Sequence, residues 1–229
     1  MKNKPFFKVG FLGIGVIVAS LVLMAINPSE APKMPDGFST PILAFEFVVS
    51  EQEVVDLFGS DPAVQAGLVR AFDLGSWVDF AYMLLYAGFL FLFAVQVVKV
   101  DGRSLFYLGA ALAVIIFLAD LLENVQLLGI TARLDEGEYG RQLTLLPIFT
   151  WIKWGSLAIY FLLLTPYFFT QNLFARIIGI LSIVTFTLGG IAFLNRSAFN
   201  EYYAKAVAVM FVLMIVYSFI TKSNHEFNE

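Results

Sequence analysis

The chain has 229 residues, of which 59% are hydrophobic and only 14% are charged, and 25 are phenylalanine. This composition is typical of a polytopic membrane protein and predicts a single integral membrane domain spanning residues 1–229, with membrane lipid as its surroundings. The net charge is −4, and Lys and Arg form no cluster that could follow a phosphate backbone. Nucleic acid is therefore excluded as a partner.

Two residue types with strong site chemistry are almost missing. The chain has no cysteine, and its one histidine, His225, lies in the polar tail at residues 223–229. Disulfides, thiolate catalysis, Cys/His zinc sites, bis-histidine haem and a Ser-His-Asp triad are thereby excluded from the membrane body. No haem or Cys/His zinc site is expected, and any other cofactor or metal is unknown from the sequence. Site chemistry must come from carboxylates, lysine, tyrosine, hydroxyls and amides.

Long apolar runs predict an all-α fold, a polytopic transmembrane helical bundle with about six membrane spans. The expected spans are residues 9–26, 76–98, 104–130, 144–168, 174–194 and 203–221. The first run is long for a signal peptide and ends at Asn27-Pro28, a helix exit, so we expect an uncleaved anchor. Cleavage there would leave five spans.

Positive charge predicts the orientation. Lys2, Lys4 and Lys8 precede the first span, and Lys and Arg are denser in the segments expected on that side of the membrane than in those on the other. The positive-inside rule and the even number of spans then place both termini in the cytoplasm, in a multi-pass protein of the cell (inner or plasma) membrane.

The longest segment between spans, residues 27–74, is expected to form a helical cap on the outer side. Its first part is rich in proline and should be extended. An amphipathic helix should follow and end at Gly59, and Asp61-Pro62 should open a second short helix that reaches about Phe72. The apolar face of the amphipathic helix is expected to comprise Phe47, Val48, Val54, Val55 and Phe58.

The third span carries an unusual polar face. Asp120, Glu123 and Asn124 have i, i+3, i+4 spacing, so they share one side of a helix. Two acids at mid-membrane cost about +5 to +7 kcal/mol on the insertion scale. These groups therefore need partners elsewhere in the chain.

Lys153 in the fourth span is the expected partner, because it is the only basic residue inside a predicted span. Counted from the outer helix ends, Lys153 and Asp120 both lie about 13 to 15 Å deep. In the second span, Asp79, Tyr82 and Tyr86 form a polar stripe with i, i+3, i+7 spacing. The complete set of candidate binding residues is Asp120, Glu123, Asn124, Lys153, Asp79, Tyr82, Tyr86, Trp154 and Glu46.

Two members of this set have a plain alternative explanation. Asp79 lies near the outer end of its span, where it could cap the helix or reach the surface. Glu46 is a lone acid in an apolar stretch, and we expect it to be solvated on the polar side of its helix.

The acids outnumber the lysine, so either a carboxyl group is protonated or a cation completes the site. The first functional hypothesis is binding or transport of a proton, a cation or a small polar or lipid ligand from the outer face. The second is a structural or accessory membrane subunit, in a homo-oligomer or with a complex partner, whose charges only fix helix register. The third is a lipid-modifying enzyme using carboxylate acid/base chemistry, with Thr150 and Ser156 one turn from Lys153.

Overall fold

A computed structural model describes residues 4–222, and residues 1–3 and 223–229, which include Lys2 and His225, lie outside the described part. Within the described residues, six long helices are apolar enough to cross a membrane. They are α1 (Phe7–Ile26), α4 (Pro62–Asp101), α5 (Tyr107–Thr131), α6 (Gly140–Phe169), α7 (Leu173–Leu194) and α8 (Ala198–Ile220). A short 3₁₀ turn, η1 (Ser104–Phe106), leads directly into α5. The predicted bundle of six membrane-spanning helices is confirmed.

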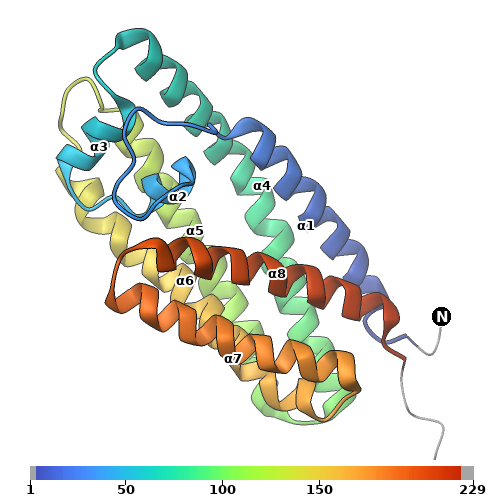
Figure 1. The fold of residues 1–229 in the computed structure, drawn as a ribbon. Helices are drawn as coiled ribbons and strands as arrows, with labels where there is room; N and C mark the ends of the chain where they lie inside the picture. The colour runs from blue at the N-terminus through green and yellow to red at the C-terminus, as the bar shows by residue number, and fades with distance from the viewer. Residues whose placement is uncertain (1–3, 223–229) are drawn as a thin grey trace, which may run out of the picture.

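Neighbours along the chain pack together from α4 to α8, and α1 packs against both α4 and α8. The first and last helices therefore lie side by side and close the bundle (Figure 1). The described chain starts and stops at one end of the bundle, which we call the terminal end. The short helices α2 and α3 lie at the opposite end, which we call the cap end (Figure 1).

Helix α4 differs from the prediction of a short helix followed by a separate span. It is one helix of 40 residues, about 60 Å long at 1.5 Å per residue. Its start is as predicted, because the Asp61 carboxylate accepts hydrogen bonds from the N–H groups of Ala63 and Val64. Gly75 does not end the helix, since a glycine costs only about 1 kcal/mol relative to alanine inside a helix. Its missing side chain leaves room for the Asn27 amide.

The cap also differs from the prediction of a single amphipathic helix, because it contains two helices, α2 (Pro41–Glu46) and α3 (Glu51–Phe58). Ser50 caps α3 by accepting a hydrogen bond from the Glu53 N–H, so this helix starts later than expected. The predicted inward position of Val55 is wrong, since its side chain is 49% exposed. Val54 and Phe58 are buried as predicted, and Leu57, which was not predicted, is buried with them.

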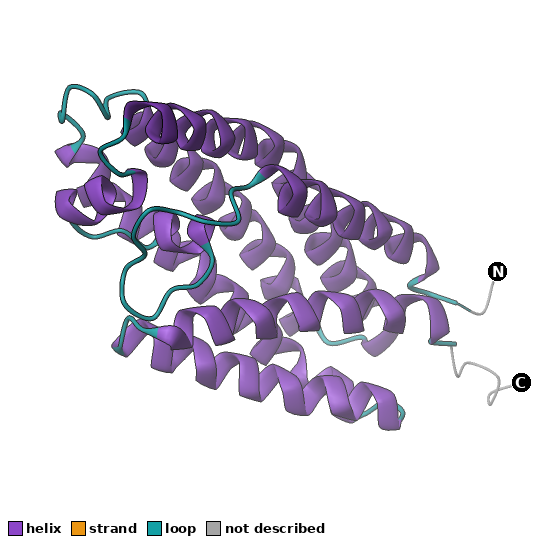
Figure 2. Cartoon of the chain, turned by 45° about the horizontal axis from the view of Figure 1, so that its top comes forward, coloured by secondary structure: helices purple, strands orange, loops and turns teal. Residues whose placement is uncertain are grey.

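Three other features of the cap are as predicted. Phe47 and Val48 are buried in the turn between the two short helices. Gly59 ends α3 with φ +71°, a backbone conformation that favours glycine. Residues 27–40 contain no helix and form a strap that runs from α1 to α2 across the cap end (Figure 2).

Two polar contacts hold the cap against the start of α8. The Glu201 carboxylate accepts hydrogen bonds from the N–H groups of Ser39 and Thr40, at 2.9 and 2.7 Å, and from the Thr40 hydroxyl at 2.9 Å. Arg196 donates to both carboxylate oxygens of Glu53, at 2.8 and 3.0 Å. Such charge-assisted hydrogen bonds are stronger than neutral ones. They fix the strap and α3 to the rest of the bundle.

At the terminal end, α1 and α8 approach closely. A Cβ atom at Gly13 would lie 2.5 Å from Ile215 Cγ1, and one at Gly10 would lie 2.8 Å from the Phe219 ring. Nearby, the hydroxyls of Tyr167 and Tyr217 are 2.8 Å apart. The two helices therefore pack through glycine at the terminal end, and they diverge toward the cap end (Figure 1).

Candidate functional site

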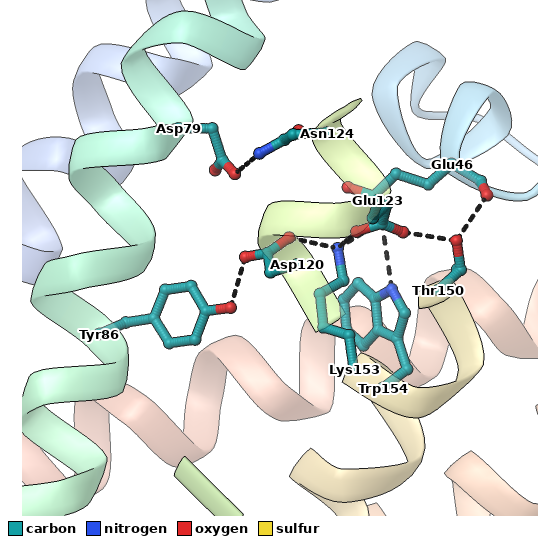
Figure 3. A network of polar contacts seen from close by, with 9 residues as sticks. All are labelled: Glu46, Asp79, Tyr86, Asp120, Glu123, Asn124, Thr150, Lys153 and Trp154. Carbon is teal, nitrogen blue, oxygen red and sulfur yellow. Dashed lines mark hydrogen bonds and ion pairs between the residues drawn. The ribbon is translucent and has the colours of Figure 1, made fainter. Parts of the chain in front are cut away.

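Lys153 lies at the centre of a buried polar cluster (Figure 3). Its Nζ is 3.2 Å from Asp120 Oδ1 and 3.2 Å from Glu46 Oε2, and it also forms an ion pair with Glu123. The lysine is only 6% exposed. Its pairing with the acidic face of α5, expected from matched depth, is confirmed.

The polar face of α5 reaches two neighbouring helices, as its i, i+3, i+4 spacing allows. On one side, Tyr86 of α4 donates a hydrogen bond to Asp120, and Asn124 donates to Asp79 Oδ2 at 2.6 Å. On the other side, Glu123 accepts a hydrogen bond from the Thr150 hydroxyl of α6 at 2.6 Å. Asp79 is therefore directed at α5 and does not cap its own helix.

The prediction that Glu46 is solvated is wrong. Its Oε2 accepts hydrogen bonds from Lys153 at 3.2 Å and from the Trp154 indole N–H at 3.1 Å. Pro41, Ala44 and Phe45 of α2 are buried, and this anchors the helix so that its last residue reaches the cluster. Burial raises the pKa of Glu46, the Lys153 ammonium lowers it, and the Asp120 charge raises it again.

A cavity of about 230 Å³ lies beside this cluster. One wall is polar and comprises Glu46, Asp79, Tyr82, Tyr86, Asp120 and Lys153. The rest is mainly apolar and includes Leu23, Leu43, Trp154, Leu157, Val207 and Phe211. Most of the predicted site residues therefore line one space. Glu123 and Asn124 do not line it but contact Lys153 and Asp79, which do (Figure 3).

Several oxygens at the cavity have no hydrogen-bond donor. In the part of the chain that the structure describes, both carboxylate oxygens of Asp120 and of Glu123 have a polar partner. Glu46 has partners only at Oε2, and Asp79 has one only at Oδ2. Asn27, which also lines the cavity, has a buried Oδ1 without a partner. The carboxylates at this site thus leave acceptor oxygens free, while the Lys153 ammonium is surrounded by acids.

Sequence reasoning missed three contributors. Asn27 was only assigned to a helix exit, and Thr150 was considered as a nucleophile. In the structure the Thr150 hydroxyl contacts Glu123 and, at 3.1 Å, the Glu46 carbonyl. Glu201 was missed because its span was expected to start later. The sequence did contain a signal for the earlier start of this helix, because Ser197 and Asn200 form a capping box that starts α8 at Ala198.

The cluster offers no metal centre of the usual kind. Among residues 4–222, no group of three or more His, Cys, Asp or Glu side chains is arranged to hold a metal ion. No hydrogen bond joins Lys153 to Thr150 or Ser156 within this range, so a hydroxyl/lysine nucleophile gains no support from the geometry.

Comparisons with protein-family models, curated proteins and solved structures found no match. The functional argument therefore rests on the chemistry of the cavity and its walls.

Proposed function

We propose that this membrane protein binds a small organic cation in the cavity beside Lys153. The observation that carries the proposal is that Glu46 and Asp79 each present an unpaired carboxylate oxygen at an internal space of about 230 Å³. Three carboxyl groups pair with the Lys153 ammonium, and a fourth, that of Asp79, belongs to the same cluster. Uncompensated charge is costly in a membrane, so a cationic ligand would balance this excess of acid.

The size and walls of the cavity support a compact ligand. Drug-sized ligand pockets usually measure about 300–1,000 Å³, so this smaller space suits an amine or another small cation. Tyr82, Tyr86, Trp154 and Phe211 supply aromatic surface, which attracts cations through the ring quadrupole. An ammonium would donate hydrogen bonds where acceptors are free.

The floor of the cavity favours binding over passage through the bundle. The Phe211 ring packs against the rings of Tyr86, Phe89 and Phe161, with centroid distances of 5.9, 6.1 and 6.1 Å. These rings separate the cavity from the aromatic packing at the terminal end. Transport would require them to move, whereas binding requires no such change.

The proposal can be tested by thermal unfolding of the protein in lipid nanodiscs, with n-butylammonium, choline and spermidine as probes. A ligand that binds only the folded state stabilises it by about 2.7 kcal/mol at 100 times its dissociation constant. At least one probe should stabilise the wild type, and Asp79→Asn should abolish the effect while its new amide oxygen still accepts from Asn124.

Asp73→Asn is the matched control. Asp73 lies on the same helix, accepts a hydrogen bond from Thr131 at 2.6 Å and does not line this cavity. This variant should respond like the wild type. A wild type that responds to no cation, or an Asp79→Asn variant that responds fully, would contradict the proposal.

The second candidate is a structural role, favoured by the way the cluster joins four elements. Direct polar contacts connect α2, α4, α5 and α6 through Glu46, Asp79, Asp120 and Lys153. Buried ion pairs can fix helix register without any ligand. On this alternative, substitutions in the cluster lower stability and no cation produces a shift.

A further inference from the structure

The residues of α1 and α8 that line the cavity are all apolar. Leu23 of α1 lines it on one side, and Ala204 and Ala208 of α8 line it on the other. The Ala208 side chain is exposed at the surface of the bundle, and Ala204 is half-buried. We call these three residues the side window, because they border the cavity where α1 and α8 diverge (Figure 1).

The side window is confined to the half of the bundle nearer the cap. Toward the terminal end, Gly10 and Gly13 let α1 and α8 close together. At the cap end, Leu43 and Glu46 of α2 line the cavity. The strap crosses the same end of the bundle (Figure 2), and Glu201 holds it through Ser39 and Thr40. With the cap held in this position, a ligand from the bilayer would reach the cavity through the side window.

The geometry points to a specific ligand class, a long-chain amine that enters sideways from the leaflet at the cap end, and this inference rests on the proposed function. The alkyl chain would lie in the side window, where two alanines leave space between apolar neighbours. The protonated amine would reach the unpaired oxygens of Asp79 and Glu46. Each methylene group of the chain that is buried against apolar residues would tighten binding about fourfold.

The hydrogen-bond donors and acceptors at the site limit the chemical class of the head group that can bind. A phosphate or carboxylate would need hydrogen-bond donors, but the Lys153 ammonium is already shared by Glu46, Asp120 and Glu123. An anionic group would also be repelled by the surrounding acids. A simple amine needs only acceptors, and the unpaired oxygens of Asp79 and Glu46 supply them.

The test uses Trp154 as a reporter in nanodiscs. The chain has three tryptophans, so Trp77→Phe with Trp151→Phe leaves Trp154 alone. A C16 alkylamine brominated near its head group should quench Trp154 fluorescence in a saturable way. The alcohol with the same brominated chain should give no saturable quenching, because it lacks the charge.

Ala208→Phe should fill the side window and raise the concentration for half-maximal quenching at least about tenfold, the effect of losing roughly two buried methylene groups. Val209→Phe is the matched control, since Val209 is 49% exposed and does not line the cavity. Val209→Phe should quench like the wild type, and cooperative thermal unfolding of both variants without any amine shows that they are folded.

The outcomes separate this inference from the proposed function. If n-butylammonium binds as tightly as the C16 amine and Ala208→Phe changes neither, the side window is overturned and the cation site stands. If the brominated alcohol quenches as strongly as the amine, the amine class is overturned. If no amine of either length binds, the proposed function fails together with this inference.

Discussion

The Lys153 ammonium lies 3.2 Å from the Glu46 carboxylate, so a residue inside the helical bundle is paired with a residue of the cap. Lys153 also keeps Asp120 and Glu123 as partners. Glu46 is therefore the one acid in the cluster whose position depends on the cap. The strap and its Glu201 contact thus help to define the site.

Glu46→Gln should change how stability depends on pH. Glu46 faces Lys153, Asp120, Glu123 and Asp79, and burial raises its pKa above the ordinary value of about 4.3. A raised pKa means that the folded protein holds this proton more tightly than the unfolded chain. Its contribution is present below the ordinary pKa and is lost as pH rises through the folded value.

Thermal unfolding between pH 4 and 8 should therefore show the wild type losing stability relative to Glu46→Gln as pH rises. Glu51→Gln is the control, because Glu51 is exposed at the start of α3 and away from the cluster. Its profile should run parallel to the wild type. Parallel profiles for Glu46→Gln would contradict the assignment.

Lys153→Met should be strongly destabilising. Removing one partner of a buried ion pair leaves an uncompensated charge and costs about 3–5 kcal/mol. Adding Glu123→Gln or Asp120→Asn should recover much of the loss, because fewer charges are then left unpaired. Unfolding in detergent or nanodiscs measures this, with exposed Lys99→Met as the control expected to match the wild type. Additive losses in both double variants would refute the coupling.

The spans were predictable because each apolar run identifies a membrane helix without reference to a partner. The continuity of α4 was not predictable, because the break in the apolar pattern at Leu74 and Gly75 looks the same whether the helix stops there or continues beyond the membrane. In the structure the helix passes through Gly75, and the Asn27 amide packs where this residue has no side chain. A glycine in the sequence therefore does not by itself identify the end of a helix.

The centre of the site was predictable for a similar reason. Helical spacing places Asp120, Glu123 and Asn124 on one face, and depth alone brings Lys153 to them. Glu46 was placed in solvent because its direction depends on the path of the strap and on the latch at Glu201. That path is set by contacts between residues more than 150 positions apart, which periodicity cannot reveal.

Gly13→Ala and Gly67→Ala should have opposite effects on stability. A Cβ at Gly13 would lie 2.5 Å from Ile215 Cγ1 and 3.1 Å from the Phe89 ring, so α1 and α8 would have to move apart at a cost of about 1–3 kcal/mol. A Cβ at Gly67, on an exposed turn of α4, meets nothing within 4 Å and should add about 0.5–1 kcal/mol. Chemical unfolding under matched conditions compares the two, and equal shifts would show that α1 and α8 do not pack through Gly13.

The orientation of the bundle in the membrane is the last prediction. The structure places the cap opposite the terminal end (Figure 1), and the lysines before the first span predict that the terminal end is cytoplasmic. Since the chain lacks cysteine, single cysteines can be introduced at exposed positions without background. Ser60 precedes α4 and Glu136 follows α5, at the cap end, whereas Ser104 lies between α4 and α5 at the terminal end; all three residues are exposed.

A thiol reagent that cannot cross the membrane should label Ser60→Cys and Glu136→Cys in intact cells, and should label Ser104→Cys only after permeabilisation. All three should react equally in detergent, which controls for accessibility. Labelling of Ser104→Cys alone in intact cells would reverse the orientation. The side window would then face the cytoplasmic leaflet, and the amine would have to reach Asp79 from that side.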